Sequence, residues 1–175
     1  MPHDTVNGIP RVDPRAPRAV WRRFLLALAS TGPGAALHRM IAAPLDGPIM
    51  RATRGRVNLA AGTLPVAVLT STGARSGRPR ATPLAYFTDG DDVILVASNY
   101  GGARHPSWYY NLLAHPACQL HIGEHGGRFV ARETTGADRD RLYALAADFY
   151  PGYIRYAQRT DGVRTIPVLR LTPAG

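Results

Sequence analysis

The sequence predicts an α+β fold in which an antiparallel sheet or small barrel carries flanking helices. Its 175 residues suit one domain with its own core. Six apolar stretches have the length and composition of strands, and short turns containing glycine join several of them into hairpins. Helical segments stand between strand pairs instead of after every strand. This order favours antiparallel pairing over an alternating βαβ arrangement.

The predicted strands are residues 64–70, 80–88, 92–98, 117–122, 128–133 and 164–171. Asp89-Gly90 is a tight turn that makes the second and third strands a hairpin. The apolar spacing predicts helices at residues 105–114, 138–149 and 150–158. Together these elements define a domain over residues 63–175.

The first 62 residues differ from this domain in composition. Residues 1–18 contain four prolines and hardly any large apolar side chain, which predicts a mobile tail. In residues 19–62, apolar side chains recur at helical spacing around residues 21–28, with two arginines on another face. The apolar run is too short for a twin-arginine signal peptide. We therefore expect an N-terminal helical segment that packs on the domain or rests on a membrane surface.

Charge narrows the classes of function. Arginine supplies all 21 basic residues against 12 acidic ones, for a net charge of +9. Because guanidinium is flat and permanently charged, it suits phosphate and carboxylate, so an anionic partner is expected. Nucleic acid is disfavoured because the arginines are spread along the chain and the usual motifs are missing. No apolar run reaches the roughly 18 residues of a membrane-spanning helix.

Two candidate reactive groups have ordinary structural explanations. Residues 121–125, HIGEH, match the H-x-x-E-H zinc pattern, which requires a helix. Here the pattern follows an apolar strand and contains glycine, and an extended strand would hold the two imidazoles about 13 Å apart. We therefore expect no metal site. Cys118 lies among alternating apolar residues, is expected to fill core space, and excludes an intramolecular disulfide as the one cysteine.

The turn at residues 72–80 has the features of an anion cradle. Two glycines let backbone N–H groups converge, and Ser76 adds a hydroxyl. The turn also carries three arginines, Arg75, Arg78 and Arg80. The alternative is a solvated hairpin turn with basic flanks.

Aromatic residues mark two further segments. Trp108 follows a glycine-containing loop at residues 96–102 and offers a stacking face, unless it and Leu112 are the inward stripe of their helix. Three tyrosines recur at intervals of three and share one helical face: Tyr150, Tyr153 and Tyr156. Two interpretations are open: the tyrosines line a ligand pocket, or they pack into the core.

Several sequence motifs follow one another along the domain in an order that is typical of a known family. The chain carries LTSTGARSGRPRATPL, DDVILVASNYGG, HPSWYYNLLAHP, YPGYIRY and RTIPV in succession between residues 64 and 171. In motif and spacing it resembles the deazaflavin-dependent nitroreductase and quinone reductase family, whose members use reduced coenzyme F420. The resemblance implies a split β-barrel with the deazaflavin in a groove between sheet and helix.

The resemblance also implies the residues of the site. The cofactor's phosphate and oligoglutamate tail would lie at Ala74, Arg75 and Ser76. The other implied cofactor contacts are Arg80, Ala81, Thr82, Pro83, Leu84, Ala85, Val96, Ala97, Ser98, Asn99, Ser107, Trp108, Tyr109, Tyr110, Asn111 and Tyr153. The acceptor pocket would be formed by Tyr150, Tyr153 and Tyr156, with a catalytic hydrogen bond to the acceptor oxygen from Ser98 or Tyr153. Ala74 stands where family members commonly have a basic residue, a loss that nearby arginines can offset.

The implied activity is hydride transfer from reduced F420 to an electron-poor small molecule, namely a quinone, a nitroaromatic or an activated alkene. A quinone is the leading acceptor because a lipid-soluble substrate would explain the basic helix. We expect a cytoplasmic protein with peripheral contact to the inner face of the membrane, and the oligomeric state stays open. The alternatives are an FMN-dependent oxidoreductase of similar barrel form and a deazaflavin carrier without catalysis.

Overall fold

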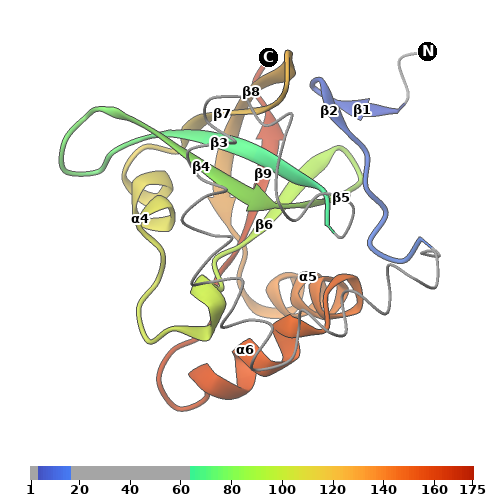
Figure 1. Cartoon of the computed structure of the whole chain (residues 1–175), viewed down its shortest axis with the longest axis vertical. Helices are drawn as coiled ribbons and strands as arrows, with labels where there is room; N and C mark the ends of the chain where they lie inside the picture. Colours follow the sequence, from blue (N-terminus) through green and yellow to red (C-terminus); the bar gives the residue numbers. More distant parts are fainter. Residues whose placement is uncertain (1–3, 17–63) are drawn as a thin grey trace.

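A curled antiparallel sheet of seven strands forms the centre of the molecule (Figure 1). The computed structural model describes residues 4–16 and 64–175. The strands of the sheet are β3 (Val66–Thr72), β4 (Pro79–Ala85), β5 (Phe87–Asp89), β6 (Asp92–Val96), β7 (Ala117–Ile122), β8 (His125–Glu133) and β9 (Val168–Pro173). Their spatial order is β4-β3-β7-β8-β9-β6-β5. Within the described residues the helices are α4 (Ser107–Ala114), α5 (Gly136–Phe149) and α6 (Gly152–Thr160), together with the 3₁₀ turn η2 (Asn99–Gly101).

The chain order explains why the sheet curls. β4 and β5 lie at opposite edges of the sheet, yet Tyr86 is the one residue between them in sequence. The sheet must therefore bend until its edges approach, and β4 also lies against β6. The result is a half-barrel, compatible with a split barrel. At the corner, the Tyr86 hydroxyl donates to the Pro10 carbonyl at 3.1 Å, and burial raises its pKa to about 12.

The corner at Tyr86 shows that one predicted strand was wrong. The strand expected over residues 80–88 is two strands broken at Tyr86, so the sheet has seven strands where six were predicted. The hairpin through Asp89-Gly90 is confirmed, with Phe87 opposite Ile94. The predicted helices are also found, with ends shifted by about two residues. The last strand begins at Val168 and not at Arg164.

The prediction of a mobile tail is wrong for residues 4–16. β1 (Thr5–Val6) and β2 (Ile9–Pro10) form a hairpin whose turn, Asn7-Gly8, has positive φ at both residues, a geometry that Asn-Gly favours. Ile9 is fully buried in the barrel core. A side chain at Gly8 would come within 2.8 Å of the Gly126 backbone, so the hairpin lies directly against the β7–β8 hairpin. The apolar side chains of this segment are few, but the core buries them.

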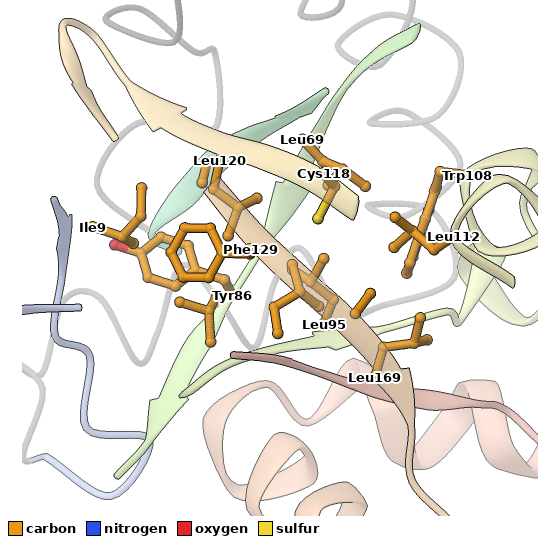
Figure 2. Packing of buried hydrophobic residues seen from close by; sticks show 14 of the residues in the cluster. Ile9, Leu69, Tyr86, Leu95, Trp108, Leu112, Cys118, Leu120, Phe129 and Leu169 are labelled. Carbon is orange, nitrogen blue, oxygen red and sulfur yellow. The ribbon is translucent and has the colours of Figure 1, made fainter. Parts of the chain in front are cut away.

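Two apolar clusters lie on opposite faces of the sheet. Figure 2 shows the cluster inside the half-barrel, with Ile9 and Phe129 at one end and Trp108 and Leu112 at the other. The N-terminal hairpin thus covers one end of this core, and α4 covers the other. The second cluster lies between the sheet and helices α5 and α6. β6 contributes alternate residues to both clusters, which explains its uninterrupted apolar sequence.

The N-terminal helical segment predicted for residues 19–62 lies outside the described residues. Within the described ranges, no helix combines the length and the apolar character needed to span a bilayer.

An ion-pair network fastens α5 to the sheet. Arg170 on β9 donates to Asp92, Asp89 and Asp138, at distances between 2.9 and 3.2 Å. Arg141 on α5 donates to Asp89 and Asp138. Hydrogen bonds from Arg141, and then from Arg170, hold the pKa values of both carboxyl groups below their usual range.

This network predicts a loss of stability in acid. Because the folded-state pKa values of Asp89 and Asp138 are lowered, their contribution is present at neutral pH and disappears as pH falls through those values, below about 4. Arg170→Gln should lower the free energy of unfolding at pH 7 by about 1–3 kcal/mol and flatten this acid dependence. Urea denaturation at several pH values measures both effects.

Arg141→Gln is the matched comparison, because its side chain is 48% exposed against 15% for Arg170. Arg141→Gln should lower the free energy of unfolding by about 1 kcal/mol or less. If both variants lost the same free energy of unfolding, this result would contradict a larger contribution from the more buried Arg170.

Candidate functional site

Besides β4 and α4, the predicted site residues lie on three segments, each of which packs against an element that carries others. The first is the turn between β3 and β4, which lies beside α4. The second is the loop after β6, which contains η2 and packs on α6. The third is α6 itself, with the tyrosines. Because α4 follows the loop directly in sequence, turn, helix, loop and α6 form one continuous side of the molecule (Figure 1).

The β3–β4 turn is held by backbone bonds and by one buried side chain. The Gly73 N–H donates to the Arg78 carbonyl at 2.9 Å, and the Gly77 N–H donates to the Gly73 carbonyl at 2.8 Å. Asn111 on α4 accepts from the Ala74 N–H at 2.9 Å and donates to Ser71 Oγ at 3.3 Å. The Asn111 amide, expected to contact a cofactor ring, is therefore engaged with the turn.

The arginines of this turn are available to a ligand. Arg75, Arg78 and Arg80 are exposed, and none makes an ion pair or side-chain hydrogen bond with a residue in the described ranges. Gly77 has positive φ and open space where a side chain would project. Three unpaired guanidinium groups around an open turn fit an anionic group such as phosphate or a run of carboxylates.

β4 continues from this turn as an edge strand. It pairs with β3 in continuous register, from Thr72 opposite Pro79 to Val66 opposite Ala85. Its other side has no strand partner among the described residues. Residues 81–85 are half-buried, and these include Thr82, Pro83 and Leu84. An edge of this kind offers backbone hydrogen bonds to a planar ligand lying alongside it.

Trp108, expected to offer a stacking face to the cofactor, lies inside the half-barrel. Its side chain is 4% exposed and packs with Leu112 and Cys118 inside the half-barrel (Figure 2). It belongs to the inward stripe of α4 and presents no open stacking face. The neighbouring Tyr109 is also buried, and its hydroxyl donates to Glu133 at 2.8 Å. Tyr110, by contrast, is 48% exposed.

The loop after β6 has an unusual backbone. Asn99, Tyr100 and Gly101 all have positive φ, at 47°, 53° and 73°. Left-handed residues other than glycine are strained and are often found at functional sites. Ser98 immediately precedes them and is half-buried, so the predicted catalytic hydroxyl stands next to the strained turn. Sequence reasoning missed Arg164, which reaches this loop from the segment before β9.

The three predicted tyrosines belong to a larger aromatic cluster. The ring of Tyr153 lies 5.5 Å from Tyr150 and 5.9 Å from Tyr156, measured between centroids. Tyr100 and Tyr143, which sequence reasoning missed, contact Tyr156 and Tyr153 respectively. Their spacing in sequence gave no signal, because each comes from a different element.

The cluster keeps its phenols protonated. Burial raises the pKa of Tyr153, which is 7% exposed, and that of Tyr156. The pKa of Tyr143 is raised by burial to about 12, and its hydroxyl donates to the Tyr153 carbonyl at 2.8 Å. At neutral pH these groups are therefore hydrogen-bond donors and not phenolates.

Cys118 and the H-x-x-E-H residues have structural positions in the sheet. Cys118 is buried as predicted, and burial raises the pKa of its thiol to about 12. The H-x-x-E-H residues form the end of the β7–β8 hairpin, with Ile122 opposite His125. The two imidazoles thus lie on neighbouring strands, not along one extended strand as expected. In residues 4–16 and 64–175 no three His, Cys, Asp or Glu side chains group as metal ligands.

The curled antiparallel sheet, with a basic turn and a tyrosine cluster on it, is compatible with the barrel fold that the motifs implied. Comparison with known proteins agrees. The sequence profile of the F420H(2)-dependent quinone reductase family matches residues 46–173. An F420H(2)-dependent quinone reductase of Mycobacterium tuberculosis is 36% identical over 132 residues, covering 73% of this chain and 87% of the relative.

Solved structures give the same result. An F420-H2 dependent reductase is 37% identical with a TM-score of 0.56, and covers 61% of this chain and 93% of its own. A second structure, described as a domain-swapped dimer, is 32% identical with a TM-score of 0.58, and covers 80% of this chain and 99% of its own. The chain therefore belongs to the F420H(2)-dependent quinone reductase family. As a member it is an F420-dependent reductase, with reduced coenzyme F420 as its cofactor.

The geometry of the turn predicts a specific effect of Asn111. In Asn111→Ala the Ala74 N–H loses its acceptor, so its hydrogen exchange should accelerate, and the free energy of unfolding should fall by about 1–2 kcal/mol. Amide exchange followed by NMR tests this directly. Ser71→Ala is the control, because it removes the other partner of Asn111 and leaves the Ala74 bond. Slow exchange at Ala74 in Asn111→Ala would contradict the assignment.

Proposed function

We propose that the chain transfers a hydride from reduced F420 to a quinone, with the cofactor tail bound at the β3–β4 turn and the acceptor at the tyrosine cluster. The observation that carries this proposal is the set of three exposed arginines on an open glycine turn, which have no ion-pair partner among the described residues: Arg75, Arg78 and Arg80. An anionic cofactor tail is the ligand that their charge and exposure suit.

The turn holds the tail mainly through charge. Arg75 and Ser76 are exposed at its tip, and Arg80 follows at the start of β4. Since Ala74 brings no charge and its N–H is bonded to Asn111, the arginines carry this part of the binding. The half-barrel then directs the rest of the ligand along β4, where residues 81–85 border the site.

Reduced F420, when bound, supplies the hydride. The chain's own task is to hold the acceptor in register and stabilise the negative charge that develops on its oxygen. Tyr153 suits this task because its phenol is protonated at neutral pH and can donate, and burial raises its pKa further. Ser98 stands on the adjoining loop as the second candidate donor. The scarcity of His–Asp pairs at the site agrees with such positioning chemistry.

A quinone is preferred among the acceptors because aromatic edges and phenol donors surround the proposed pocket. Apart from Tyr143, whose hydroxyl is engaged with the Tyr153 carbonyl, the clustered tyrosines offer ring edges for a flat acceptor and hydroxyls for its carbonyl oxygens. A nitroaromatic would meet the same groups, and an activated alkene with one carbonyl would meet them with fewer matched hydrogen bonds.

Tyr153→Phe tests the acceptor side of the proposal. Removing the phenol hydroxyl should lower kcat for quinone reduction by about tenfold to a hundredfold, because a donor to the developing charge is lost. The Kd for the cofactor should change by less than about twofold. The rate is read from the visible absorbance that returns as F420 is oxidised, first with a quinone and then with a nitroaromatic.

Tyr143→Phe is the comparison, since its hydroxyl is already engaged with the Tyr153 carbonyl. It should retain most of the activity. Binding of F420 without turnover of any acceptor would indicate a carrier, and turnover with FMN in place of F420 would indicate the other alternative. Unchanged kinetics in Tyr153→Phe would remove this residue from the mechanism.

A further inference from the structure

Arg164 makes an unusual set of contacts with the loop after β6. Its Nε donates to the Gly102 carbonyl at 2.9 Å, and one terminal nitrogen donates to the Ser98 carbonyl at 2.8 Å. The other terminal nitrogen contacts the Ala97 carbonyl at 3.4 Å and His105 Nδ1 at 2.9 Å. None of these partners is a carboxylate, and burial lowers the pKa of the guanidinium.

The histidine contact fixes a protonation state. A guanidinium can only donate, so His105 Nδ1 must accept and the ring must be neutral, with its proton on Nε2. Burial and the Arg164 charge both lower the pKa of His105, which agrees with a neutral ring. All four loop partners of Arg164 are therefore acceptors, and its planar fork reaches each of them.

The contacts bracket the strained turn. Ser98 precedes the left-handed residues 99–101 and Gly102 follows them, so one guanidinium joins the two ends of the turn. Inside the turn, the Asn99 side chain donates to the Arg104 carbonyl at 2.9 Å. The turn is also pressed onto α6, because a side chain at Gly101 would approach Tyr156 Cα to 3.1 Å. Strained backbone of this kind persists only where its surroundings hold it.

We propose that Arg164 is a positioning residue that holds the left-handed turn, and thereby sets Ser98 against the tyrosines of α6 for acceptor binding. The inference rests on the proposed function of this site. Arg164 touches neither cofactor nor acceptor in this account, and it acts through the Ser98 and Gly102 carbonyls. A lysine would keep the charge at this position, but its compact ammonium cannot bridge both ends of the turn.

The first test needs no cofactor. In Arg164→Gln and Arg164→Lys, amide hydrogen exchange at Gly101 and Gly102 should accelerate at least about tenfold, while exchange in β7 and β8 stays as in the wild type. Arg155→Gln is the control, because this arginine is exposed on α6 and its side chain makes no hydrogen bond with the described residues of the loop. Unchanged exchange at Gly101 and Gly102 would overturn the proposal.

The second test separates positioning from general stabilisation. Arg164→Ala should lower kcat for quinone reduction about tenfold or more with the Kd for F420 nearly unchanged, and Arg164→Lys should not recover it. Arg164 lines a surface cavity of about 450 Å³, together with Thr160, Gly162 and Ile166, so the truncated site is open to small solutes. Added guanidinium should therefore restore activity to Arg164→Ala, whereas ammonium at equal ionic strength should not.

The results of these tests separate the proposed function from the positioning role of Arg164. A wild-type protein that transfers no hydride would contradict the proposed function, whatever the exchange data show. A wild-type protein that is active, with Arg164→Ala equally active or not rescued by guanidinium, would overturn the positioning role alone.

Discussion

The connection between β4 and β5 is the constraint on which the rest of the structure depends. Because Tyr86 alone separates the two edges of the sheet, the sheet must curl into a half-barrel, and the Tyr86 side chain is buried at the corner. Curling encloses one apolar cluster, which α4 and the N-terminal hairpin cover at either end. It also leaves β4 as the edge strand beside the basic turn, where a planar ligand can lie along the sheet.

Among the described residues, the candidate site depends mainly on side chains that hold the backbone in place. Asn111 holds the β3–β4 turn through the Ala74 N–H, and Arg164 holds the loop after β6 through the carbonyls of Ser98 and Gly102. Hydride transfer requires donor and acceptor in close register, so precise placement can supply much of the barrier reduction. Both residues act on segments that sequence reasoning had already assigned to the site.

Local patterns predicted much of the fold, and long-range contacts account for what they missed. The hairpins, the helices and the burial of Cys118 follow from periodicity and turn residues. The break at Tyr86 does not, because it depends on closure of the sheet. Asn7-Gly8 was an available hairpin signal, but the burial of Ile9 required the barrel to be present. The contacts of Arg164 could not be predicted from sequence, because its partners lie about sixty residues earlier in the chain.

Binding of F420 measured across a range of salt concentrations tests the central claim most directly, namely that the arginines of the β3–β4 turn anchor the cofactor. We expect Arg75→Gln combined with Arg78→Gln to weaken F420 binding about threefold to tenfold at low salt and to reduce the salt dependence of that binding. Arg132→Gln, an exposed change on β8, should leave both unchanged. Equal affinity and equal salt dependence in all three proteins would contradict the account.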